Sequence, residues 1–233
     1  MAQATADFEL GTNGNDILTS DPGSATAWDI RLNADAGNTI KYDNTHVYGV
    51  LAAKFDRSGN TSAACQMEWT TGIGTLTDWH GRNYLYATAN PPGSFRVVKD
   101  ITGGALIVYI QADGTIQSYD TVGGLLYTTT NSIALNQWVR IEWHWIHSTT
   151  VGQGELKLFN NPDSSTPTET VISAANKNTG ANTSDVSFGL ADGGSSAGPI
   201  WLEHCVAGAT SYPGSAIVPT AVATGPIASP IRW

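Results

Sequence analysis

Apolar and polar residues alternate along much of this chain with the period of two that is typical of β-strands. The clearest stretch is residues 136–160, NQWVRIEWHWIHSTTVGQGELKLFN, in which two aromatic and β-branched runs flank a glycine-containing connection. This pattern predicts a β-hairpin. Successive side chains of a strand point to opposite faces, so the first run has an apolar face and a mixed face. The apolar set is Val139, Ile141, Trp143 and Trp145, and the mixed set is Trp138, Arg140, Glu142 and His144.

A second hairpin is predicted at residues 106–121, where Asp113-Gly114 supplies the positive φ values that a tight turn needs. Residues 34–37 are expected to join another pair of strands. Together the runs predict roughly twelve to fourteen strands with turns every eight to twelve residues, which indicates an all-β, two-sheet antiparallel sandwich. The remaining expected strands are residues 7–10, 27–33, 39–42, 47–56, 62–70, 84–88, 95–101, 125–130, 170–173, 186–190 and 200–206.

The composition changes near the end of the chain, where residues 217–233 read IVPTAVATGPIASPIRW. Three prolines and no strand period predict an extended arm rather than a further domain. We therefore expect one domain at residues 1–215, which is ample length for a single sandwich, and an arm at 216–233. The terminal residues Ile231, Arg232 and Trp233 are expected to anchor that arm during assembly.

The formal net charge is −9, and the eleven Lys and Arg residues are scattered. No basic surface for nucleic acid or an anionic membrane is therefore expected. No run of eighteen apolar residues occurs, and the N-terminal residues lack a signal-peptide pattern, so a soluble protein is expected. Cys65 and Cys205 are too few for a disulfide framework, and buried free thiols are favoured, with a single bridge left open.

Eight Trp and eight Tyr residues raise the question of sugar binding, because aromatic rings stack on the C–H faces of sugars. Trp79 and Trp138 are the candidate exposed platforms, the first because residues 71–83 are expected to form a loop. A purely structural role in the core or in a capping loop remains the alternative. The candidate hydrogen-bonding partners are His80, Arg82, Arg140, Glu142 and His144.

Residues 135–142 (LNQWVRIE) and 154–159 (GELKLF) resemble the concanavalin A-like, laminin-G-like jelly-roll superfamily. Residues 187–189 (SFG) and 201–208 (WLEHCVAG) are similar to later strands of that superfamily. The resemblance covers about residues 6–212 and implies a jelly-roll sandwich. Glu203-His204 replaces an acidic pair that is common there, so no metal or ligand role is carried over to these positions.

The overall style of the sequence also resembles virion proteins of tailed bacteriophages, notably those of actinobacteria. This likeness implies a non-enzymatic capsid-decoration or minor tail protein, located in the virion and made in the host cytoplasm. Its expected partners are other virion proteins and further copies of itself in a homo-oligomer, with adhesion to host surface glycans as a second role. A secreted or virion-borne lectin is the alternative.

The same superfamily contains glucan hydrolases, which need two carboxyl groups about 5 to 5.5 Å apart for retaining hydrolysis. None of the six glutamates lies two or four residues from another, so no enzyme is expected. Glu142 and Glu203 could still meet across strands. His144 and His147 should lie on opposite faces, which disfavours zinc there. No cofactor is expected, and calcium bound by Asp and Asn in turns stays an alternative.

Overall fold

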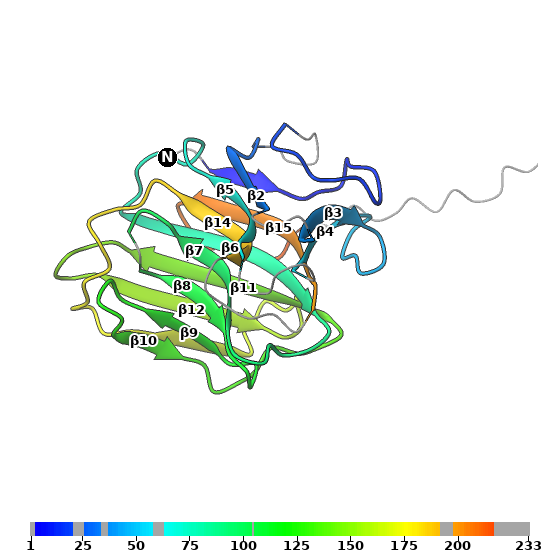
Figure 1. Cartoon of the computed structure of the whole chain (residues 1–233). Helices are drawn as coiled ribbons and strands as arrows, with labels where there is room; N and C mark the ends of the chain where they lie inside the picture. Colours follow the sequence, from blue (N-terminus) through cyan, green and yellow to red (C-terminus); the bar gives the residue numbers. More distant parts are fainter. Residues whose placement is uncertain are drawn as a thin grey trace, which may run out of the picture.

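The computed structural model describes residues 3–20, 26–33, 37–57, 63–103, 105–191 and 198–216, and these form two antiparallel β-sheets packed face to face (Figure 1). The predicted all-β, two-sheet sandwich is confirmed. Within the described residues there is no helix that could span a membrane. The residues of the expected anchor, Ile231, Arg232 and Trp233, lie outside the described part of the chain.

The eight-stranded sheet has the order β13-β12-β11-β6-β15-β4-β3, and β1 pairs with β15 beside β4. The seven-stranded sheet has the order β10-β9-β8-β7-β14-β5-β2. The strands of the first sheet are β1 (Ala4–Ala6), β3 (Thr39–Asp43), β4 (Ala52–Asp56), β6 (Asp78–Ala87), β11 (Trp138–Ile146), β12 (Gln153–Phe159), β13 (Glu169–Ile172) and β15 (Ile200–Ala209). Those of the second are β2 (Ile30–Asn33), β5 (Cys65–Trp69), β7 (Phe95–Asp100), β8 (Ile107–Ile110), β9 (Ile116–Tyr119), β10 (Leu125–Thr128) and β14 (Val186–Ala191).

Both predicted hairpins are present. β11 pairs with β12 through Ile146 and Gln153, and β8 pairs with β9 through Ile110 and Ile116, next to the turn at Gly114 (φ 82°). These pairs form because alternation and turn residues act over a short stretch of chain.

Three expectations about the N-terminal third are wrong. The first strand is β1 rather than residues 7–10, because the chain turns at Phe8, which has a φ of 66° and a buried ring. β2 and β3 do not pair with each other, since β2 pairs with β5 in one sheet and β3 with β4 in the other. β2 and β3 therefore lie in different sheets, as do β4 and β5. Residues 71–83 are not all loop, because β6 begins at Asp78.

Aromatic side chains fill the space between the sheets. Trp79 of β6 meets Trp145 of β11 edge to face, with ring centroids 5.2 Å apart. Trp143 lies 6.0 Å from Phe188 of β14, which contacts Trp69 of β5 at 5.4 Å. Gly81 gives Trp143 its space, since a methyl group there would lie 2.3 Å from the indole ring. The register of β6 against β11 therefore depends on Gly81, because only a residue without a side chain can lie opposite Trp143.

The two cysteines lie in this core as buried free thiols, on β5 for Cys65 and on β15 for Cys205. Burial raises the pKa of the Cys65 thiol to about 11 and raises that of Cys205 as well. The single bridge that the sequence left open is not formed.

His147 and Asp100 form a buried polar pair. The His147 ring accepts a hydrogen bond at Nε2 from Trp79 Nε1 (3.1 Å) and donates from Nδ1 to the carbonyl of Thr179 (3.1 Å). Burial lowers the pKa of His147 to about 4, and its Nδ1 lies 3.7 Å from Asp100 Oδ2. Burial raises the pKa of Asp100 to about 7, although Thr183 and the Gly103 amide donate to this carboxyl group.

We predict that Gly81→Ala destabilises the protein by about 1 to 3 kcal/mol, because the new methyl group displaces the Trp143 ring. The control is Gly72→Ala, whose methyl group would come no nearer than 3.2 Å to a Thr26 methyl and should cost within about 0.5 kcal/mol. Urea unfolding measures both. Equal midpoints for the two variants would show that the packing at Gly81 is loose.

We predict that Asp100→Asn stabilises the protein at pH 8 and not at pH 4. A raised pKa in the folded state means that the stability which protonation supplies is complete below the ordinary value of 3.8 and lost as the pH rises to about 7. The gain over the wild type should therefore grow between these values, by at most about 1.4 kcal/mol per pH unit, and then level off. Thermal unfolding from pH 4 to 8 tests this, and a variant less stable than the wild type at pH 8 contradicts it.

Candidate functional site

The outer face of the eight-stranded sheet carries nearly all the side chains that the sequence suggested for binding. β6 and β11 lie next to each other, and their outward residues face each other in four cross-strand pairs. These pairs are His80 with His144, Arg82 with Glu142, Tyr84 with Arg140 and Tyr86 with Trp138. Six of the seven predicted sugar-binding residues are therefore together. The seventh, Trp79, faces the core with no exposed surface, so its prediction as an exposed platform is wrong.

Three segments cover the middle of this face: residues 44–50, 161–168 and 211–216. Trp138 lies under the first of them, against Tyr48 (ring centroids 6.2 Å) and Tyr86 (5.7 Å), and only 8% of it is exposed. A sugar cannot stack on a covered ring, so Trp138 is not the predicted platform either. The hydroxyl group of Tyr48 donates to Asp163, which joins two of the covering segments.

Arg140 anchors segment 161–168. Its guanidinium group donates to the carbonyls of Pro162 and Ser164 and stacks on the Phe159 ring, 3.7 Å from the centroid. Its Nε lies 3.3 Å from Glu142 Oε1, and both side chains are buried. Burial raises the pKa of Glu142 in spite of the nearby Arg140 and Arg82. The predicted binding groups Arg140 and Glu142 are thus occupied in holding the protein together.

Arg82 has the same kind of role for segment 211–216. Its Nη1 donates to the carbonyl of Gly214 (2.7 Å) and its Nε to that of His204 (3.2 Å). The amide of Ala216 donates to the Tyr84 hydroxyl (2.7 Å). The segment therefore crosses the sheet at a fixed place, with one hollow on each side of it.

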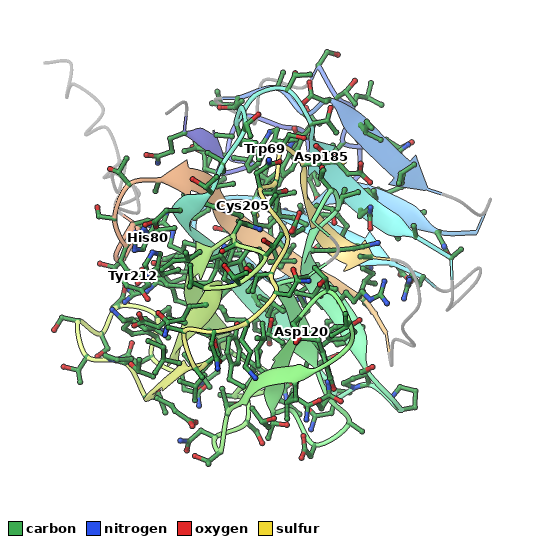
Figure 2. All side chains as sticks on the ribbon, turned by 90° about the vertical axis from the view of Figure 1, so that its left-hand side faces the viewer. Trp69, His80, Asp120, Asp185, Cys205 and Tyr212 are labelled. Carbon is green, nitrogen blue, oxygen red and sulfur yellow. The ribbon has the colours of Figure 1, made fainter. Side chains whose placement is uncertain are left out.

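The smaller hollow has a volume of about 360 Å³ and borders Arg140, Glu142, Lys157 and Tyr212. Nearby, His80 and His144 are stacked in parallel with ring centroids 4.0 Å apart, and Tyr212 lies edge-on to His80 at 4.7 Å. Figure 2 shows His80 and Tyr212 side by side. Burial and the neighbouring His144 lower the pKa of His80. This corner is where the predicted residues reach solvent, but its histidines stack on each other, and Lys157 Nζ lies 3.4 Å from the centroid of the Tyr212 ring.

The larger hollow, of about 750 Å³, lies between segment 211–216 and the N-terminal strand. Glu9 and His204 line it, and together with Glu203 they are the one group of potential metal ligands found among the described residues. Glu203 is fully buried and accepts hydrogen bonds from the amides of Tyr48 (2.6 Å) and Gly49 (3.1 Å). Its burial raises its pKa to about 8.

The seven-stranded sheet has an open outer face with a hollow of about 710 Å³. Tyr109 of β8 and Tyr119 of β9 stand there edge to face, 5.3 Å apart, and both are partly exposed. The Arg96 guanidinium group lies 5.2 Å from the Tyr109 ring centroid, and its Nε donates to the Tyr109 hydroxyl (2.8 Å). Further polar groups border the hollow: Lys99, Gln111, Asp120 and Thr121.

This tyrosine patch, which we define as Arg96, Tyr109 and Tyr119, was missed by the sequence reasoning, although the sequence carries a signal for it. The turn at Asp113-Gly114 fixes the register of β8 against β9, with Tyr109 opposite Gln117. The alternation then puts both tyrosines on the face opposite to Val108, Ile110 and Ile116. An aromatic residue on the polar face of a hairpin is the feature to look for.

No protein-family model matches the chain, and no curated protein sequence matches it significantly. Solved structures with a similar fold include the receptor-binding domain of botulinum neurotoxin type G, with a TM-score of 0.53, 10% identity, and coverage of 93% of this chain and 48% of that one. The receptor-binding domain of the botulinum neurotoxin mosaic serotype C/D has a TM-score of 0.52 and 10% identity, with coverage of 92% of this chain and 48% of that one. The botulinum neurotoxin serotype D ligand-binding domain, solved in complex with N-acetylneuraminic acid, has a TM-score of 0.51 and 8% identity, with coverage of 88% of this chain and 46% of that one. The chain thus spans about half of these domains, and the likeness is one of fold.

We predict that Arg140→Lys lowers stability nearly as much as Arg140→Ala, by about 3 to 5 kcal/mol, because a lysine cannot reach two carbonyls and a carboxylate as a planar fork does. Arg96→Ala, which removes a partly exposed arginine from the other sheet, should cost much less. Chemical denaturation at pH 7 compares the three. An Arg140→Ala variant as stable as the wild type would mean that this arginine is free for a ligand after all.

Proposed function

We propose that this chain is a carbohydrate-binding β-sandwich that holds a saccharide on the outer face of its seven-stranded sheet, against Tyr109 and Tyr119. The observation that carries the proposal is the contrast between the two sheets. The largest rings on the outer face of the eight-stranded sheet, Tyr84, Trp138 and Trp201, are buried, whereas both tyrosines of the patch are partly exposed and the patch borders a hollow of about 710 Å³. Protein sites for sugars combine such accessible rings with a few fixed polar groups.

Each part of the patch has a defined task in this proposal. Tyr109 and Tyr119 present ring faces to the C–H groups of a sugar. Arg96 donates a hydrogen bond to the Tyr109 hydroxyl group and lines the hollow with its positive charge. Gln111 and Asp120, at opposite sides of the hairpin, can bind hydroxyl groups. Arg96 and Lys99 together favour a sugar that carries a carboxylate.

A protein with this fold has been solved with N-acetylneuraminic acid, which supports testing sialylated glycans first. This chain covers less than half of that domain, so the position of its sugar is not transferred. Acidic plant and bacterial glycans form the second group of probes. Neutral β-glucans form the third.

The finer hypothesis is that the module belongs to a bacteriophage virion, as a capsid-decoration or minor tail protein that adheres to host glycans and forms a homo-oligomer. Its support is the style of the sequence, and the fold is equally compatible with a secreted lectin. This setting therefore stays a prediction. Mass spectrometry of purified phage particles would decide between a virion protein, which should be present in them, and a secreted lectin, which should be absent.

The proposed role is non-enzymatic. Glu142 and Glu203 lie on β11 and β15, which are separated by β6, and they lie opposite different residues of β6, Arg82 and Tyr84, so their backbones are more than roughly 9.5 Å apart. Retaining hydrolysis needs carboxyl groups about 5 to 5.5 Å apart and inverting hydrolysis about 6.5 to 9.5 Å apart, and both need carboxyl groups that a sugar can reach, whereas Glu142 and Glu203 are buried. Arg140 also pairs with Glu142. Reducing sugar released from a glucan panel, and lost on Glu142→Gln, would support the enzyme of this fold instead.

We expect the chain to bind a subset of an array of sialylated, uronate-containing and neutral glycans. Tyr109→Ala and Tyr119→Ala should each weaken binding of the best ligand about tenfold or more, since losing a stacked ring costs roughly 1.4 kcal/mol. Tyr109→Phe should lose less, because it keeps the ring. Calorimetry on variants with unchanged thermal unfolding measures these effects.

The matched control is His144→Ala on the other sheet, which should leave affinity unchanged. Binding that survives Tyr109→Ala and is lost on His144→Ala would place the site on the eight-stranded sheet. A well-folded sample that binds no glycan on the array contradicts the proposed function itself.

A further inference from the structure

We propose that Glu9, Glu203 and His204 form a binding site for a zinc ion at the border of the larger hollow on the eight-stranded sheet. The site lies on the opposite sheet from the tyrosine patch and does not depend on sugar binding. One ligand atom from each of the three side chains lies within 4.8 Å of the other two. Zinc ligands at about 2.0 to 2.2 Å from the ion lie roughly 3.3 Å apart, so a movement of about 1 Å by each ligand atom would complete the site.

Two of the three side chains have buried atoms with no hydrogen bond in the described structure, Glu9 Oε1 and His204 Nε2. Buried polar atoms almost always have a partner, so an exception needs an explanation. His204 is 92% buried, borders the hollow, and has Glu203 Oε2 at 3.6 Å from its Nε2, which is beyond hydrogen-bond distance. An ion between these atoms would satisfy the imidazole nitrogen and both carboxylates at once.

One oxygen of Glu9 and both oxygens of Glu203 accept hydrogen bonds from one segment, residues 48–50. The Val50 amide donates to Glu9 Oε2 (2.8 Å). The amides of Tyr48 and Gly49 donate to the two oxygens of Glu203. Gly49 is needed for this approach, since a methyl group there would lie 1.7 Å from Glu9 Oε1. Hydrogen bonds of this kind orient ligands around metal ions in proteins.

The backbone of β15 explains why two consecutive residues can serve one site. In a regular strand, Glu203 and His204 would point to opposite faces. The pairing of β15 with β6 shifts its register between Glu203 and Val206, and His204 has a φ of 47°. Leu202 and Cys205 both pack in the core, so the irregularity leaves Glu203 and His204 on the outer side together. A left-handed histidine costs roughly 1 to 2 kcal/mol, and such strain collects at functional sites.

The chemistry of the ligands selects the ion. Calcium prefers six to eight oxygen ligands, whereas imidazole suits zinc and neighbouring transition metals. Two carboxylates and one imidazole leave a fourth position of a tetrahedral zinc ion open, and the hollow lies at that side. Asp7 also borders the hollow but is outside the group of three, which makes it the matched control.

The test measures zinc binding to the full, tag-free chain by calorimetry, together with the midpoint of thermal unfolding with and without zinc. We expect one zinc ion per chain and a higher unfolding midpoint in its presence. Loss of a group that supports a metal ligand typically weakens metal binding roughly 10- to 100-fold. Glu9→Gln and Glu203→Gln each remove a ligand charge, so each should weaken zinc binding by at least that factor. Asp7→Asn should weaken binding far less, because Asp7 contributes a nearby negative charge and no ligand atom.

His204→Asn separates a ligand from a structural residue, because asparagine tolerates positive φ better than other residues. If His204 is a zinc ligand held in a strained backbone conformation, His204→Asn should unfold at the same or a higher temperature than the wild type without zinc. Its unfolding temperature should no longer rise when zinc is added. Cobalt(II) substitution adds a spectroscopic readout, in which the wild type should show tetrahedral visible bands that His204→Asn lacks. The proposal is overturned if the wild type binds no zinc, if His204→Asn and Glu9→Gln bind it normally, or if Asp7→Asn weakens binding equally. None of these results would alter the glycan test.

Discussion

The packing of Trp79, Trp143 and Trp145 between the two sheets is the constraint on which the arrangement of the eight-stranded sheet depends. All three rings have no exposed surface, and Gly81 leaves the space that Trp143 fills. A slip of one residue along β6 or β11 would turn these rings toward solvent, at a cost far above that of any contact on the outer face. The inward rings therefore decide which polar residues face outward and which of them meet.

Because this register is fixed, the outer face of the sheet acquires a dense set of charges and rings, and the protein covers them. Segments 161–168 and 211–216 each receive backbone hydrogen bonds from an arginine, Arg140 or Arg82. On the seven-stranded sheet, the tyrosine patch borders a hollow of about 710 Å³, and Tyr109 and Tyr119 are partly exposed. The two faces thus differ: Arg82, Arg140 and Glu142 on one are occupied in contacts within the protein, and the partly exposed tyrosines on the other border a hollow.

Much of this fold follows from local features of the sequence. The alternation at Trp138 to Trp145 gave the correct inward and outward sets, and Asp113-Gly114 gave a correct hairpin. The errors came from contacts between distant parts of the chain. Trp138 is buried by Tyr48, ninety residues earlier, and β2 and β3 separate because each finds a partner in a different sheet. The placement of His204 beside Glu203 depends on the register shift in β15 and on the positive φ of His204, and no turn residue in the sequence indicates either of them.

The account rests on the claim that the tyrosine patch, and not the covered face, receives the ligand. The most direct measurement is a nuclear magnetic resonance titration with the best glycan, following backbone amides and tyrosine ring signals. The account predicts that the shifts cluster on Arg96, Tyr109 and Tyr119 and leave His80, His144 and Tyr212 unchanged. Shifts that cluster around His144 and Tyr212 instead, with the patch unaffected, would contradict it.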